Sequence, residues 1–171
     1  MNLTDDTRTA AMEKLSLVLW RERELLEGLQ YALEVEQMIL ASGRNRWLMR
    51  AATDVEAVLE TLRKTEVLRA VAADEAGSSL GLAPNPSLKE LAARAGEPWG
   101  EILSDHRDAF VSMTRSITEL ADSNRELITS GYRSARETLL AMDEAAEGYT
   151  ADGSAVLSPA VVGPSRIDRT F

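Results

Sequence analysis

Three titratable side chains, Glu22, Glu36 and His106, interrupt otherwise apolar helical stripes and are the residues best placed to do chemistry. Two carboxylates on one helix face could share acid–base work. A histidine on an inward face could bind a metal, but helical metal bundles need a Glu-x-x-His pair, and no Glu stands three residues before this single histidine. We therefore expect Glu22 and Glu36 to pair with arginines such as Arg21 and Arg23, on the same helix or another. We expect His106 to be a bundle-edge histidine with a hydrogen-bond partner.

Other catalytic patterns are missing from the sequence. It has no glycine-rich phosphate loop, no Ser/His/Asp set and no dinucleotide fingerprint, and the lack of cysteine excludes disulfides, thiolate zinc sites and cysteine nucleophiles. The sequence thus predicts no enzymatic activity, no cofactor and no metal.

The net charge of −9 argues against nucleic acid and anionic lipid as partners, because both attract basic surfaces. The segment 87–96 is similar to the first half of a helix-turn-helix. The residues that follow, 97–105, are acidic, whereas a DNA-reading helix should be basic. The N-terminal residues lack the features of a secretory signal, and no run approaches the about 18 apolar residues that span a bilayer. We therefore expect a soluble cytoplasmic protein without membrane insertion.

Apolar spacing and a low aromatic content of 5% predict an all-α protein. The expected architecture is an elongated antiparallel helical bundle of three long helices plus one short helix. The long helices are expected over 8–42, 45–76 and 99–147, and the short one over 87–95. We expect residues 1–147 to form a single domain and 148–171 to form a flexible C-terminal tail, because glycine, proline and serine replace the periodicity there.

The predicted core is mostly leucine. Gly43 should end the first helix, and Ser87 with Glu90 forms the sequence signature of a capping box. The tryptophans at 20, 47 and 99 are expected to pack between helices. The first helix should bury Leu15, Leu19, Leu26, Leu29, Leu33 and Leu40. The second should bury Trp47, Leu48, Ala51, Val55, Val58, Leu59, Leu62, Leu68 and Ala72.

The C-terminal helix carries an apolar stripe that changes register partway along. A first ladder, in steps of four and three, runs through Trp99, Leu103, His106, Phe110, Met113, Ile117, Leu120, Asn124 and Leu127. Its continuation reaches Gly131, Ser134 and Thr138, which bury little. A second ladder, offset by one position, then runs through Ile128, Tyr132, Ala135, Leu139 and Met142. A helix with one set of neighbours keeps one stripe, so the second ladder is a candidate partner-binding face.

Helix lengths support this interpretation. At about 1.5 Å per residue, the first helix spans about 52 Å and the C-terminal helix about 73 Å. If the two start level, the C-terminal helix outruns the bundle near residue 134. Intramolecular burial of the second ladder, against the tail or another helix, is the alternative to a partner.

The chain resembles the FlgN family of flagellar type III export chaperones over about residues 12–153. The longest matching feature is LVLWRERELLE over 17–27. Shorter matches are Leu33-Glu-x-Glu36, Ala41-Ser-Gly-Arg44, Arg46-Trp-Leu48, Leu80-Gly-Leu82 and Leu88-x-x-Leu91. Glu97-Pro-Trp99, Asn124-x-x-Leu127-Ile128 and Tyr149-x-x-x-Gly153 complete the series.

This resemblance implies a cytoplasmic chaperone that binds the terminal helical segment of hook-associated proteins, prevents their premature assembly and delivers them to the flagellar export gate and its ATPase components. It implies a site on the C-terminal helix, made of Asn124, Leu127, Ile128, Tyr132, Ala135, Leu139 and Met142. The alternative is a homodimeric coiled-coil adaptor that uses the same face for self-association.

Overall fold

The computed structural model describes residues 3–147, and the surroundings of the side chains from 6 to 143. All regular elements in this part of the chain are helical. They are α1 (Leu3–Ala41), a 3₁₀ turn (Asn45–Trp47), α2 (Leu48–Ser79), α3 (Leu88–Ala95) and α4 (Trp99–Glu147). The predicted all-α class, with three long helices and one short one, is therefore confirmed.

Three helix boundaries differ from the prediction by three residues or more, and one of them is the start of α2 at Leu48 instead of residue 45. α1 begins at Leu3 instead of residue 8, because polar first-turn residues such as Asp5 suit a helix N-terminus without adding to the apolar period. α2 continues to Ser79 instead of ending at residue 76, and therefore contains Gly77. A Cβ atom at Gly77 would lie 2.6 Å from Cγ of Pro86, so glycine lets the following loop pack closely against the helix.

Glycines and a capping box end and start the helices. Gly43, with a φ of 67°, follows the end of α1 as predicted, and Gly81, with a φ of 72°, follows the end of α2. At the start of α3, Oγ of Ser87 accepts a bond from the Glu90 amide at 3.2 Å, and the Glu90 carboxylate accepts one from the Ser87 amide at 2.8 Å. The predicted capping box is confirmed.

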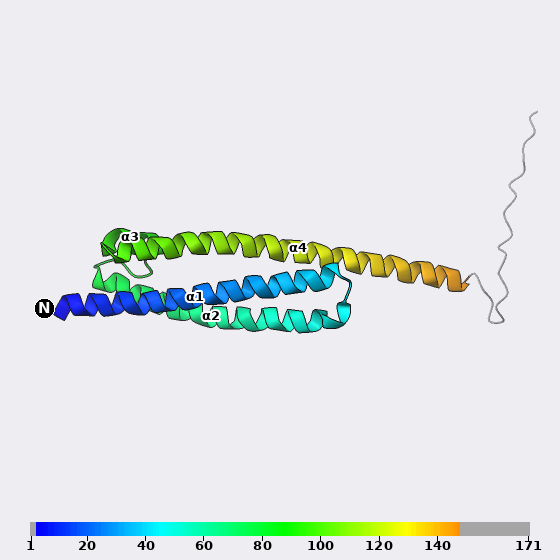
Figure 1. Ribbon diagram of the computed structural model, residues 1–171, viewed down its shortest axis with the longest axis horizontal. Helices are drawn as coiled ribbons and strands as arrows, with labels where there is room; N and C mark the ends of the chain where they lie inside the picture. Colours follow the sequence, from blue (N-terminus) through cyan, green and yellow to red (C-terminus); the bar gives the residue numbers. More distant parts are fainter. Residues whose placement is uncertain (1–2, 148–171) are drawn as a thin grey trace, which may run out of the picture. The chain divides into compact units, whose positions relative to one another are not determined.

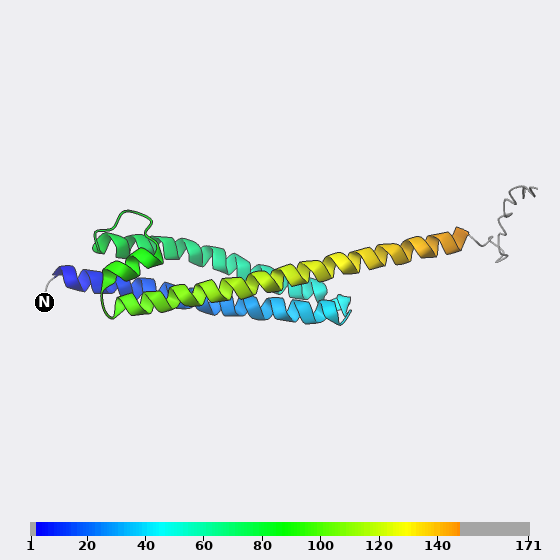
Figure 2. The same ribbon diagram turned by 90° about the horizontal axis from the view of Figure 1, so that it is seen from above.

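The chain divides into two compact units, residues 1–128 and 129–171, with the boundary inside α4. In the first unit α1 and α2 form an antiparallel hairpin, and the first part of α4 lies along it (Figure 1 and Figure 2). The expected single domain over 1–147 stays a prediction. The expected flexible tail over 148–171 lies outside the described residues.

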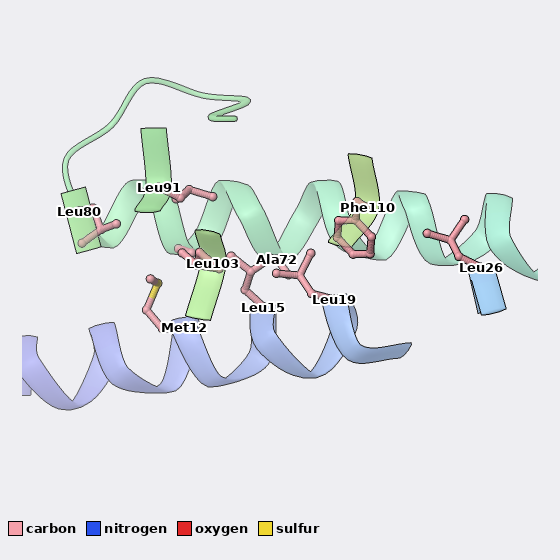
Figure 3. Close-up of a cluster of buried hydrophobic side chains, with 10 residues drawn as sticks. Met12, Leu15, Leu19, Leu26, Ala72, Leu80, Leu91, Leu103 and Phe110 are labelled. Carbon is pink, nitrogen blue, oxygen red and sulfur yellow. The ribbon is translucent and has the colours of Figure 1, made fainter. Parts of the chain in front are cut away.

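The core of the first unit is the leucine seam of α1. Figure 3 shows side chains from all four helices meeting there, with Leu15 and Leu19 of α1 facing Ala72 of α2 and Leu103 of α4. The predicted seam residues of α1 are buried, apart from Leu40, which is half-buried. The prediction for the second helix was only partly right. Ala51 and Ala72 are buried, whereas Leu48, Val55, Val58, Leu59 and Leu62 are half-buried. Leu68 is 60% exposed, and Trp47, which lies in the 3₁₀ turn before α2, is 51% exposed.

A charge placed in this seam should unfold the bundle. Leu26 is 5% exposed, so the substitution Leu26→Asp is expected to lower the free energy of unfolding by about 3 kcal/mol or more, because the carboxylate would be buried without a partner. Urea titration followed by circular dichroism measures this. Leu17→Asp, on the same helix at a position 72% exposed, is the matched control and should change stability by less than about 0.5 kcal/mol. Equal losses in the two variants would contradict the core assignment.

Candidate partner-binding face

The first ladder of α4 packs inside the first unit. Leu103, His106 and Phe110 are 9% exposed or less, and Met113 and Ile117 pack against the same core. This part of α4 is thus an internal helix of the bundle, as the ladder predicted, and it runs parallel to α1. The direction follows from two contacts, since His106 meets Trp20 and Asn124 meets Leu33.

A group of polar contacts marks the end of the buried ladder. Asn124 is 2% exposed, and its Nδ2 donates to the backbone oxygen of Leu33 at 2.9 Å and to the Glu36 carboxylate at 2.9 Å. Ser123 directly precedes Asn124 on α4, and its hydroxyl accepts a bond from the Gln37 side-chain amide of α1 at 2.9 Å. We call Leu33, Glu36, Gln37, Ser123 and Asn124 the polar clamp. Its Asn124 faces α1 and is not part of any exposed surface, although the family resemblance had placed it in the partner site.

Exposure begins directly after the clamp. Leu127 is half-buried, and each side chain from Ile128 to Asp143 is exposed. Among the second-ladder residues, Ile128 is 47%, Tyr132 72% and Leu139 67% exposed. The exposed stripe consists of Ile128, Tyr132, Ala135, Leu139 and Met142, joined by Leu140, and we call it the α4 face.

Leu140 was missed in the sequence because it fits neither ladder. It directly follows Leu139, is 55% exposed, and widens the C-terminal half of the stripe. Next to the α4 face, the positions that continue the first ladder beyond Leu127 are Gly131, Ser134 and Thr138. These short side chains leave room for another helix to approach closely, whereas long ones would hold it off.

The two seam carboxylates do not form a catalytic pair. Glu22 and Glu36 are fourteen positions apart on one helix, about 21 Å along its axis. Glu22 is 5% exposed and bonds Arg69 of α2 at 3.0 Å. Burial raises the pKa of Glu22, while the Arg69 cation opposes this. Glu36 accepts the bond from Asn124 described above. Each carboxylate therefore has a structural partner of its own.

Glu22 pairs with an arginine of another helix, Arg69, as the expectation allowed, but not with Arg21 or Arg23, which the expectation named. For Glu36 the expected arginine was wrong, because its carboxylate accepts a bond from the Asn124 amide instead. Arg21 pairs with Glu24 at 3.0 Å, and Arg23 lies over the ring of Trp20 at 4.8 Å. The nearby arginines in the sequence point elsewhere because neighbouring positions on a helix diverge by about 100°.

His106 is buried, with 1% of its surface exposed, instead of lying at the edge of the bundle. Neither ring nitrogen has a hydrogen-bond partner among the described residues, so the expected partner is not found. No cluster of three or more possible metal ligands occurs in residues 3–147. In the same range, no helix combines the length and apolar character that crossing a membrane requires.

The tryptophans divide into two kinds. Trp99 packs against the core, whereas Trp20 and Trp47 are 52% and 51% exposed. Trp20 still contacts a neighbouring helix through His106, and Trp47 lies beside the Arg46 guanidinium at 5.3 Å. The expectation of packing between helices therefore holds for Trp20 and Trp99 and is wrong for Trp47.

Comparison with known proteins gives one match. A family model described as FlgN protein matches residues 11–156, which is most of the 171-residue chain. No curated protein and no solved structure matches.

The polar clamp should contribute to stability and not to partner binding. Asn124→Ala removes both amide bonds and leaves the oxygen of Leu33 buried with less bonding, so we expect the free energy of unfolding to fall by about 1–3 kcal/mol. Glu126→Ala, an exposed position two residues further on, is the control and should be neutral. Thermal unfolding of both variants measures the difference. An unchanged melting temperature for Asn124→Ala would show that the clamp is not stabilising.

Proposed function

The chain belongs to the FlgN family of flagellar export chaperones, and on this basis we propose that it works in the cytoplasm by binding hook-associated proteins through the α4 face. The observation that carries the proposal is the continuous exposure of side chains from Ile128 to Asp143, within which apolar residues recur in steps of four and three.

The spacing of the α4 face fits a helical partner. Steps of four and three place Ile128, Tyr132, Ala135, Leu139 and Met142 on one seam, the pattern by which a helix packs against another helix in a coiled coil. Covering a large apolar side chain contributes roughly 1.5 kcal/mol, so a partner that covers four of them gains several kcal/mol. An amphipathic helix laid along this seam supplies the required apolar stripe.

The proposed mechanism is masking. Hook-associated proteins carry terminal helical segments that associate with one another once assembled, and binding to the α4 face would hide their apolar side until export. Part of the binding energy is spent on ordering the segment, so the affinity should be moderate. Moderate affinity suits handover to the export gate and its ATPase components, the delivery step of the same proposal.

Two charges on the seam should abolish cargo binding and leave the fold intact. For Ile128→Asp with Leu139→Asp, we expect binding to a hook-associated protein from the same genome to weaken at least about tenfold, because each aspartate must lose its hydration in the complex. Co-purification and light scattering detect the complex, calorimetry gives the affinity, and circular dichroism checks the helicity.

A matched control places the same charges elsewhere on the helix. Ser130→Asp with Ala141→Asp has the same spacing of eleven residues at exposed positions off the seam, and should bind normally. Unfolding of the seam variant would mean that the second ladder is core. Normal binding by it would place the cargo site elsewhere. A wild-type chain that ignores such cargo and runs as a tight dimer would instead support the coiled-coil adaptor.

A further inference from the structure

The buried histidine of α4 is enclosed by aromatic rings from two helices. Its ring centroid lies 4.8 Å from that of Trp20 on α1, with the planes at 79°, and 6.1 Å from that of Phe110, with the planes at 26°. The imidazole is 1% exposed, whereas Trp20 is 52% exposed. Trp20 is therefore a half-exposed ring that packs edge-on against the buried imidazole.

The surroundings of His106 disfavour a positive charge on the imidazole. Both nitrogens lie without a hydrogen-bond partner among the described residues, so a second N–H would gain no acceptor there. The guanidinium of Arg23 stands 4.8 Å from the Trp20 ring and repels a positive charge on the imidazole. Burial, and after it the positive charge of Arg23, holds the pKa of His106 below its ordinary value of 6.5. The negative charge of Asp105 on α4 opposes this in part.

The Glu22 carboxylate of α1 forms no hydrogen bond with His106. Glu22 precedes Arg23 on α1, and one of its oxygens accepts a bond from Arg69 of α2 at 3.0 Å. Its second oxygen is buried without a partner, and no hydrogen bond joins it to His106. Since no described group accepts a hydrogen bond from the imidazole, water is the remaining acceptor for its second N–H, and the half-exposed Trp20 is the ring packed edge-on against it.

We propose that Trp20 is a proton-operated lid over His106: when the imidazole takes up a proton, the Trp20 side chain moves aside and α4 loosens from α1 at this level. The lid lies within residues 1–128 and does not involve the α4 face. The proposal therefore stands or falls independently of cargo binding.

The pH dependence has a definite sign. The folded chain holds the proton on His106 less tightly than the unfolded chain, so the free energy of unfolding falls as the pH drops below 6.5, and the fall ends below the folded-state pKa. Over that window the unfolding equilibrium constant should rise by up to about tenfold per pH unit. Glu22 acts in the opposite direction, because its pKa is raised and protons favour its folded form.

The first test follows the single histidine of the intact chain by NMR between pH 7.5 and 5. We expect a midpoint below 6.5, accompanied by faster hydrogen exchange around Trp20 and His106 than around the polar clamp. A midpoint at or above 6.5 would overturn the proposal. So would hydrogen exchange that rises equally in both regions, since the opening would then be global.

The second test reads the lid itself. In the background Trp47→Phe with Trp99→Phe, Trp20 is the one fluorophore of its kind, and its emission should shift to the red as His106 takes up its proton. His106→Leu and His106→Gln should remove the shift and the His106 contribution to the pH dependence of the unfolding constant, while Glu22→Gln should keep both. If the Trp99 change prevents folding, Trp20→Phe in the otherwise unchanged chain replaces it. Opening the cover should then raise the midpoint of His106 toward 6.5, and an unmoved midpoint would refute the lid.

Discussion

The fold of the first unit depends on the register of α4 against α1, which the buried amide of Asn124 fixes. Asn124 bonds a backbone oxygen and a carboxylate of α1, and nearer the start of α4 His106 packs against Trp20 of α1. The apolar contacts between them would tolerate a shift of one turn, because leucine, phenylalanine and methionine fill similar volumes. The amide bonds of Asn124 would be lost in such a shift, so they select one register at some cost in desolvation.

This register decides where α4 stops being an internal helix. The polar clamp holds the last fully buried position of the first ladder, and the next one, Leu127, is only half-buried. Further positions of that ladder carry glycine, serine and threonine, which gain little from burial. The apolar residues move to the offset ladder at this point, so the change of stripe in the sequence and the end of burial in the structure coincide within a few residues.

Much of the fold could be predicted from the sequence because its signals are local. The helical period, Gly43 and the Ser87 capping box act within a few residues, and the helices, the glycine after the first helix and the cap predicted from them are confirmed. The errors are tertiary. Leu68 follows the helical period but is 60% exposed, because no neighbouring helix covers it. Glu22 pairs with Arg69, which lies 47 residues further along the chain. Thr65 is buried although polar, since its hydroxyl bonds the Thr61 oxygen of its own helix at 3.1 Å.

For the candidate site, too, a local pattern in the sequence has to be judged against the burial of side chains in the folded chain. Several large apolar side chains elsewhere are exposed, and Leu17 and Met49 are more than 70% exposed, so exposure alone identifies no binding surface. The α4 face differs because its apolar residues share one seam and because no residue from Ile128 to Asp143 has a buried side chain on any side of the helix. On the side of α1 opposite Leu17, Leu15 and Leu19 are buried and pack this helix into the core. Beyond the clamp, α4 has no such buried side within the described part of the chain. An apolar stripe there contributes to stability only when a partner or another segment covers it.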